Sequence, residues 1–166
     1  MIFLVVLLIA LAAAWLVPIG GRRRQPRDAA RIAMALAFIV AGAAHLLMPT
    51  PFVQHLPTWV PARNALIYLT GLLEIIGGLG LIGPRRCQRP VALLVALYLV
   101  AVLPANVYVA IADVAVDGQP GGWYPWLRLP LQALFIGWVL WSTPRPRCAE
   151  HADGRGPKPA MVPAGR

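Results

Sequence analysis

Glu74 is a carboxylic acid in the middle of a long apolar stretch of the sequence, residues 65–82. At about 1.5 Å of rise per helical residue, it lies roughly 13 Å into a spanning helix, near the bilayer midplane. An acid at that depth costs at least about 2.5 kcal/mol, so it is expected to face protein rather than lipid. Gly71 and Gly78 share its helix face, where a second helix can approach closely. We therefore predict that Glu74 is buried between helices and exchanges protons there.

Other polar side chains lie in the neighbouring apolar stretches, toward one common end. His45 ends the stretch 32–48, and Asn106 closely follows Pro104 in the stretch 91–112. Arg128 and Gln132 are four residues apart, so they share one helix face. These positions predict an outward-opening pocket with Glu74 at its floor and His45 as a second proton-handling group. The predicted ligand-binding residues are Asn106, Arg128, Gln132 and Thr70.

A purely structural interpretation of the same residues stays open, because polar side chains in membrane proteins often bond helices together without chemistry. Arg128 is equally explained as an interfacial residue whose head group extends to water. Pro104 cannot donate a backbone hydrogen bond, so we expect the carbonyl of Val100 to be free for a side chain or water.

The composition places these residues in a membrane protein. Of the 166 residues 59% are hydrophobic and 13% are charged, and the mean hydropathy is +0.68. Five apolar runs approach the length of roughly 20 residues that spans a bilayer. They cover residues 2–17, 32–48, 65–82 and 91–112, and a fifth begins near residue 126. We predict an all-α, membrane-spanning four-helix bundle at residues 32–143, with an additional N-terminal transmembrane helix in residues 1–21.

The cationic residues predict the orientation. Thirteen of the 15 follow the first, third or fifth run, and only Arg63 and Arg128 fall on the opposite side. The positive-inside rule makes the richer side cytoplasmic, so the N-terminus is outside and the C-terminus inside. Residues 22–31 form a basic cytoplasmic loop, and residues 144–166 a disordered cytoplasmic tail. The net charge of +9 is thereby assigned to membrane topology, and no nucleic-acid partner is expected.

Two segments of the sequence have two interpretations each. The first run is interpreted as a retained, peripheral anchor helix, although a cleaved signal peptide is the other interpretation. The proline-rich segment 49–61 is either a lid over the bundle or an ordinary interfacial loop. The second outer loop carries Asp113 and Asp117, which we expect to be solvated. Cys87 and Cys148 form no C-x-x-C pair, and no metal site or intrinsic cofactor motif is present.

Four segments resemble the DoxX-like family of small bacterial integral membrane proteins. They are AGAAHLLMP at residues 41–49, YLTGLLEIIGGLGLIGPRR at 68–86, LPANVY at 103–108 and WLRLPLQ at 126–132. The resemblance covers about two thirds of the chain and implies a four-helix membrane bundle in the bacterial cytoplasmic membrane. It also implies a link to quinone-coupled sulfur oxidation or to thiol and oxidative-stress complexes.

The leading functional hypothesis is an intramembrane polar pocket that binds a lipophilic molecule, with quinone as the candidate, for a membrane redox or stress-response partner. Quinone reduction takes up protons with electrons, which suits an acid beside an imidazole. The alternatives are a non-redox membrane enzyme or carrier for a lipid-like substrate, and a purely structural subunit. Enzyme activity is therefore left open.

The predicted topology can be tested with the two cysteines, which both fall on the cytoplasmic side. A membrane-impermeant thiol reagent applied to intact cells should leave Cys87 and Cys148 unlabelled, and permeabilisation should allow both to react. Labelling of either cysteine in intact cells would contradict the orientation.

Overall fold

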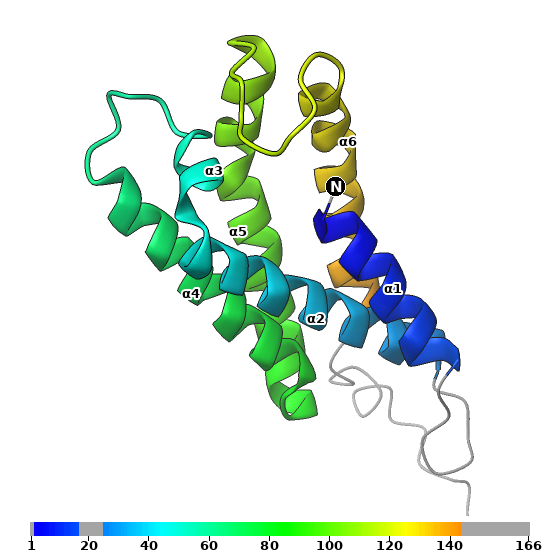
Figure 1. Cartoon of the computed structure of the whole chain (residues 1–166). Coiled ribbons are helices and arrows are strands. Elements are labelled where there is room, and N and C mark those ends of the chain that lie inside the picture. Colours follow the sequence, from blue (N-terminus) through cyan, green and yellow to red (C-terminus); the bar gives the residue numbers. More distant parts are fainter. Residues whose placement is uncertain (1, 17–24, 144–166) are drawn as a thin grey trace, which may run out of the picture.

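The computed structural model describes residues 2–16 and 25–143, and the elements within them are helices without any strand (Figure 1). The helices are α1 Ile2–Leu16, α2 Pro26–Leu47, α3 Pro49–Val53, α4 Arg63–Ile82, α5 Arg85–Ile111 and α6 Tyr124–Ser142. The all-α prediction is confirmed. In the described part of the chain, α2, α4 and α5 are long and apolar enough to cross a membrane, and α1 is a shorter apolar helix.

The helices on the arginine-rich side begin earlier than the apolar runs predict. α2 begins at Pro26, so Arg27 and Arg31 are helical although residues 22–31 were expected to form a loop. Proline suits the first helical position, and Asp28 in the first turn suits the positive end of the helix dipole. Asp28 also forms an ion pair of 2.7 Å with Arg31. The rest of that predicted loop before residue 25, and the predicted tail at 144–166, lie outside the described residues.

α2 is the central helix, and it packs against α1, α4 and α6. Its buried positions are mostly alanines, which allow these neighbours to approach closely. α1 is more than a peripheral anchor, because Leu7 is fully buried and Phe3 joins the aromatic core. The Phe3 ring lies 5.7 Å from Phe38 of α2 and 4.8 Å from Phe135 of α6.

Glycines bring the backbones of α2 and α4 into direct contact. A Cβ atom on Gly42 would lie 2.4 Å from the Gly71 carbonyl oxygen, and one on Gly78 would lie 2.7 Å from the Ala35 carbonyl oxygen. The spacing of seven residues on both helices keeps these small residues on one face. The expected close approach beside Glu74 is therefore confirmed, and α2 is the partner helix.

The outer faces of the helices carry large apolar side chains. About half of the surface of Leu69, Leu73 and Ile76 on α4 is exposed, and Leu94 and Leu97 on α5 are exposed further, at 65% each. Soluble proteins rarely expose apolar surface so continuously. Small residues inside and large apolar residues outside indicate a protein embedded in a membrane.

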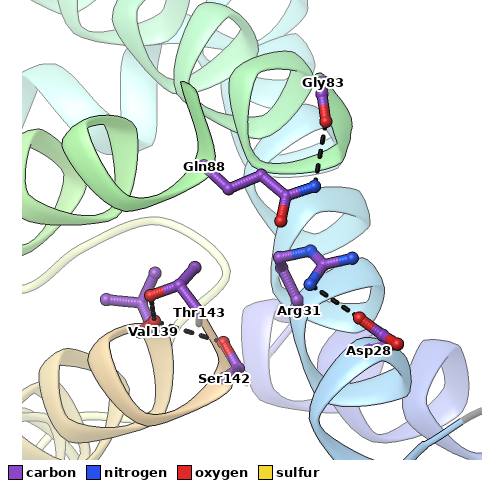
Figure 2. A network of polar contacts seen from close by, with 7 residues as sticks. All are labelled: Asp28, Arg31, Gly83, Gln88, Val139, Ser142 and Thr143. Carbon is purple, nitrogen blue, oxygen red and sulfur yellow. Dashed lines mark hydrogen bonds and ion pairs between the residues drawn. The ribbon is translucent and has the colours of Figure 1, made fainter. Parts of the chain in front are cut away.

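The arginine-rich ends of α5 and α6 are joined by hydrogen bonds. Arg89 of α5 donates to the Leu140 carbonyl at 2.8 Å and to the Thr143 hydroxyl at 3.3 Å, where a cation stabilises the negative end of the α6 dipole. Figure 2 shows the neighbouring contacts at this end, including the bond of 2.9 Å from Gln88 to the Gly83 carbonyl. At this end, hydrogen bonds therefore join the start of α5 to the end of α6.

The α2–α4 contact gives a stability prediction. Replacing Gly71 by Ala places a methyl group 2.7 Å from the Cβ atom of His45 and 2.9 Å from the Gly42 carbonyl oxygen. The helices must separate, so we expect a loss of about 1–3 kcal/mol in unfolding free energy, measured by thermal or denaturant unfolding in detergent. Gly137→Ala is the control, since its Cβ meets nothing within 4 Å. Equal stability of the two variants would contradict the close contact.

Candidate functional site

A buried cluster of three protonatable groups lies between α2, α4 and α5. The Tyr98 hydroxyl donates a hydrogen bond of 2.8 Å to Glu74 Oε1, and His45 Nδ1 lies 3.0 Å from Glu74 Oε2. Glu74 is 8% exposed, as expected for an acid enclosed by protein. Thr70 lies beside the Tyr98 hydroxyl and donates to the Ile67 carbonyl at 2.8 Å. The structure therefore brings together Glu74, His45 and Thr70 of the predicted site.

The helix geometry explains how these groups meet. Glu74 lies on the buried stripe of α4, one turn from Gly71 and from Gly78. His45 lies in the last turn of α2, and its Cβ atom occupies the space that a side chain at position 71 would need. The absence of a side chain at Gly71 thus lets the imidazole approach the carboxyl.

The two carboxyl oxygens of Glu74 differ in their bonding. Oε1 accepts the Tyr98 bond, whereas Oε2 accepts no aligned hydrogen bond from the described residues. His45 Nδ1 lies close to Oε2, but the Ala41 carbonyl is 2.9 Å away from the same nitrogen. A proton on Nδ1 therefore has two acceptors within reach, the Ala41 carbonyl and Glu74 Oε2. A buried carboxyl oxygen without an aligned donor is rare, and it can carry a proton itself or accept a bond from a water or a ligand.

The segment 49–61 contacts this cluster through Phe52. It begins with the short helix α3, and the Phe52 ring stacks on the His45 imidazole with a centroid distance of 3.7 Å and an interplanar angle of 25°. α3 lies at the end of the molecule where α5 leads into the loop before α6 (Figure 1). The position of Phe52 therefore fits the interpretation of this segment as a lid better than its interpretation as an ordinary interfacial loop.

Asn106 and Gln132 form a separate pair between α5 and α6. Asn106 Nδ2 donates to Gln132 Oε1 at 2.8 Å, and Gln132 Nε2 donates to the Leu99 carbonyl. The carbonyl that receives a side chain near Pro104 is thus that of Leu99, one residue before the expected Val100. The described hydrogen bonds of this pair run to each other and to Leu99, and none runs to Glu74 or His45.

Arg128 lies in a third group, between the loop after α3 and the loop before α6. It donates to His55 Nε2 and, at 2.9 Å, to Gln119 Oε1. His55 Nδ1 donates to the Pro51 carbonyl at 2.8 Å, which leaves Nε2 as the acceptor for the arginine. Arg128 therefore bonds these two loops to each other, and it neither contacts Glu74 nor simply extends to water.

A second bond pair holds the same two loops together. Gln54 Nε2 donates to the Asp117 carboxylate at 2.8 Å, and the Asp117 backbone N–H returns a bond of 2.8 Å to Gln54 Oε1. Asp117 was expected to be solvated, so the sequence interpretation missed its partner. Asp113 is exposed, and its backbone has a positive φ of 46°.

Sequence reasoning also missed Tyr98, Phe52 and His55. Tyr98 lies in an apolar run, where an aromatic residue gives no sign of a polar partner. His55 lies in a loop, and its burial depends on how α3 folds over the bundle. Among the hollows on the surface of the described residues, one is lined by residues from Val53 to Ala65 and another lies between α1, α2 and α6. Neither is lined by Glu74 or His45, so the outward-opening pocket stays a prediction.

Fold and site together define an α-helical, membrane-embedded protein with a buried cluster of acid, imidazole and phenol. The chain belongs to the family described as Domain of unknown function (DUF8561), whose model matches residues 34–143. The match contains all residues of the buried cluster, together with α3, α4, α5 and α6. No curated protein and no solved structure matches the chain.

The His55 contact gives a pH prediction. Burial, followed by the positive charge of Arg128, lowers the pKa of His55 from 6.5 to about 4. When the loop opens, the pKa of His55 returns to near 6.5, so the open form binds a proton that the closed form excludes. Closure of the loop is therefore weakened as the pH falls from 6.5 to about 4. The total loss in the free energy of loop closure is on the order of 3 kcal/mol.

Hydrogen exchange of residues 49–61, corrected for its intrinsic pH dependence, measures this opening. His55→Asn is the matched variant, since its amide can still donate to the Pro51 carbonyl but does not titrate. Its protection should vary much less over this pH range. A pH response as large as that of the wild-type protein would show that another group is responsible.

Proposed function

We propose that this protein binds a lipophilic molecule at Glu74 and His45, and that these two groups transfer protons to and from it. The observation that carries the proposal is Glu74 Oε2, a buried oxygen that accepts no aligned hydrogen bond from the described residues. The hydroxyl of a quinol would donate that bond, and a proton on Oε2 would instead be donated to the carbonyl of a quinone. An imidazole and a phenol on either side of the carboxyl provide the route for the proton.

The ligand class that fits is a planar ring with oxygen substituents, and quinone is the candidate. Phe52 stacks on the imidazole of His45, so this face of the imidazole accepts a flat aromatic group. A quinone ring that replaces Phe52 there would place its oxygen beside Glu74. The electrons would come from a membrane redox partner, while this chain contributes binding and proton transfer.

The proposed setting is the bacterial cytoplasmic membrane with five spans, the N-terminus outside and the C-terminus inside. α2, α4 and α5 supply three spans, and we assign α1 and α6 as the other two. Arg89, at the start of α5, bonds the end of α6, which supports antiparallel spans with both ends on the arginine-rich side. The DoxX-like resemblance supports the same four-helix arrangement behind α1.

Two other functions remain as alternatives. A structural subunit is favoured by Asn106 and Gln132, whose bonds to each other and to Leu99 link α5 to α6 without any further role. A non-redox enzyme or carrier for a lipid-like substrate would use the same Glu74 oxygen. The identity of the retained molecule separates these alternatives.

Mass spectrometry of lipophiles retained by the gently purified protein tests the proposal. Wild-type protein should retain a quinone, and Glu74→Gln should retain at least tenfold less, because the amide cannot exchange the proton and replaces one oxygen by a donor. Asp113→Asn is the matched control, since it makes the same chemical change on an exposed loop residue.

Thermal stability of each variant shows whether it folds. A folded Glu74→Gln protein that retains as much quinone as the wild type would contradict the role of the carboxyl. A wild-type protein that retains a different lipid would support the non-redox alternative, and one that retains no lipophile would support the structural subunit.

A further inference from the structure

A second candidate site lies at the opposite, arginine-rich end of the molecule. An open groove of about 440 Å³ lies where the end of α1, the start of α2 and the end of α6 meet. Its lining includes Trp15, Ala12, Pro26, Ala30, Trp138 and Trp141. The groove is apolar and belongs to none of the three polar groups described above.

A cation stands at the edge of this groove. The Arg27 guanidinium carbon lies 5.8 Å above the ring of Trp141, and Arg27 is exposed. Among the described residues, Arg27 has no carboxylate partner, whereas the nearby Asp28 is neutralised by Arg31 at 2.7 Å. The edge of the groove therefore carries a net positive charge.

We propose that this groove binds an anionic phospholipid of the cytoplasmic leaflet, with an acyl chain against the three tryptophans and the phosphate beside Arg27. The groove accepts a chain but cannot select one, because lipid tails and apolar side chains are equally apolar. Selection comes from the head group. Arg27 attracts a phosphate and repels the cationic part of a zwitterionic lipid.

The tryptophans also fix the depth of the site. Tryptophan side chains prefer the head-group level of the bilayer, and the Trp138 indole N–H is held by the Ala30 carbonyl at 3.0 Å. The chain of a lipid in the groove would thus begin at the level where Arg27 meets its phosphate. The proposal requires membrane insertion, but it does not depend on the function assigned to Glu74.

Fluorescence quenching by brominated lipids tests the site in the full-length protein. The sequence has six tryptophans, and replacing Trp59, Trp123 and Trp126 by Phe leaves only the three groove tryptophans to fluoresce. In phosphatidylcholine vesicles, a brominated phosphatidylglycerol should quench this emission more than an equal fraction of brominated phosphatidylcholine. Arg27→Gln should weaken the relative binding of the anionic lipid about fivefold.

Three comparisons decide the outcome. Arg86→Gln removes the same charge from an exposed position of α5 away from the groove and should leave the preference nearly unchanged. Arg27→Lys should keep most of the preference, and Ala12→Phe should fill the groove and reduce the quenching. Equal quenching by both brominated lipids, an Arg86→Gln loss as large as that of Arg27→Gln, or no effect of Ala12→Phe would each overturn the proposal.

Discussion

The direct contact between the backbones of α2 and α4 is the constraint on which the rest of the structure depends. Lipid tails give no hydrophobic force that drives helices together, so association relies on close packing and polar bonds. Gly42 and Gly71 remove the side chains that would keep these helices apart. The same approach carries the imidazole of His45 to the carboxyl of Glu74, 3.0 Å away. The α2–α4 packing and the His45–Glu74 contact therefore depend on the same close approach, and a larger residue at position 71 would disturb both.

The sequence predicts those features that depend on local pattern or on a large energetic cost. Long apolar runs identify the helices, and the cost of a carboxyl in a membrane predicts that Glu74 is buried. Small residues on its face predict a close neighbouring helix. The residues that sequence reasoning misplaced depend on how helices rotate about their own axes and how loops fold. The spacing of Arg128 and Gln132 places them on one face of α6, yet Gln132 contacts α5 and Arg128 contacts the loops.

The polar groups inside the protein differ in how completely they are bonded, and this difference separates structural from chemical roles. Asn106 and Gln132 use each other and a backbone carbonyl, which is sufficient reason for their presence between two helices. Glu74 has a full bond on only one oxygen. A residue that only linked helices would be better served by an amide or a hydroxyl, since an acid adds a desolvation cost without adding a bond. The choice of an acid at this position therefore favours a role that uses its proton.

A molecule that reaches Glu74 must move one of the segments around it, and their contacts differ in strength. The arginine-rich end is held by Arg89 on the α6 carbonyl, and α2 packs against three helices. At the opposite end, the segment 49–61 is held by side-chain bonds. The Gln54–Asp117 pair among them is exposed, and each bond contributes about 1 kcal/mol net. Movement of α3 with Phe52 would expose one face of His45 while the contact between α2 and α4 stays intact. Displacement of this segment is consequently the change around Glu74 that leaves the α2–α4 packing and the α5–α6 bonds in place.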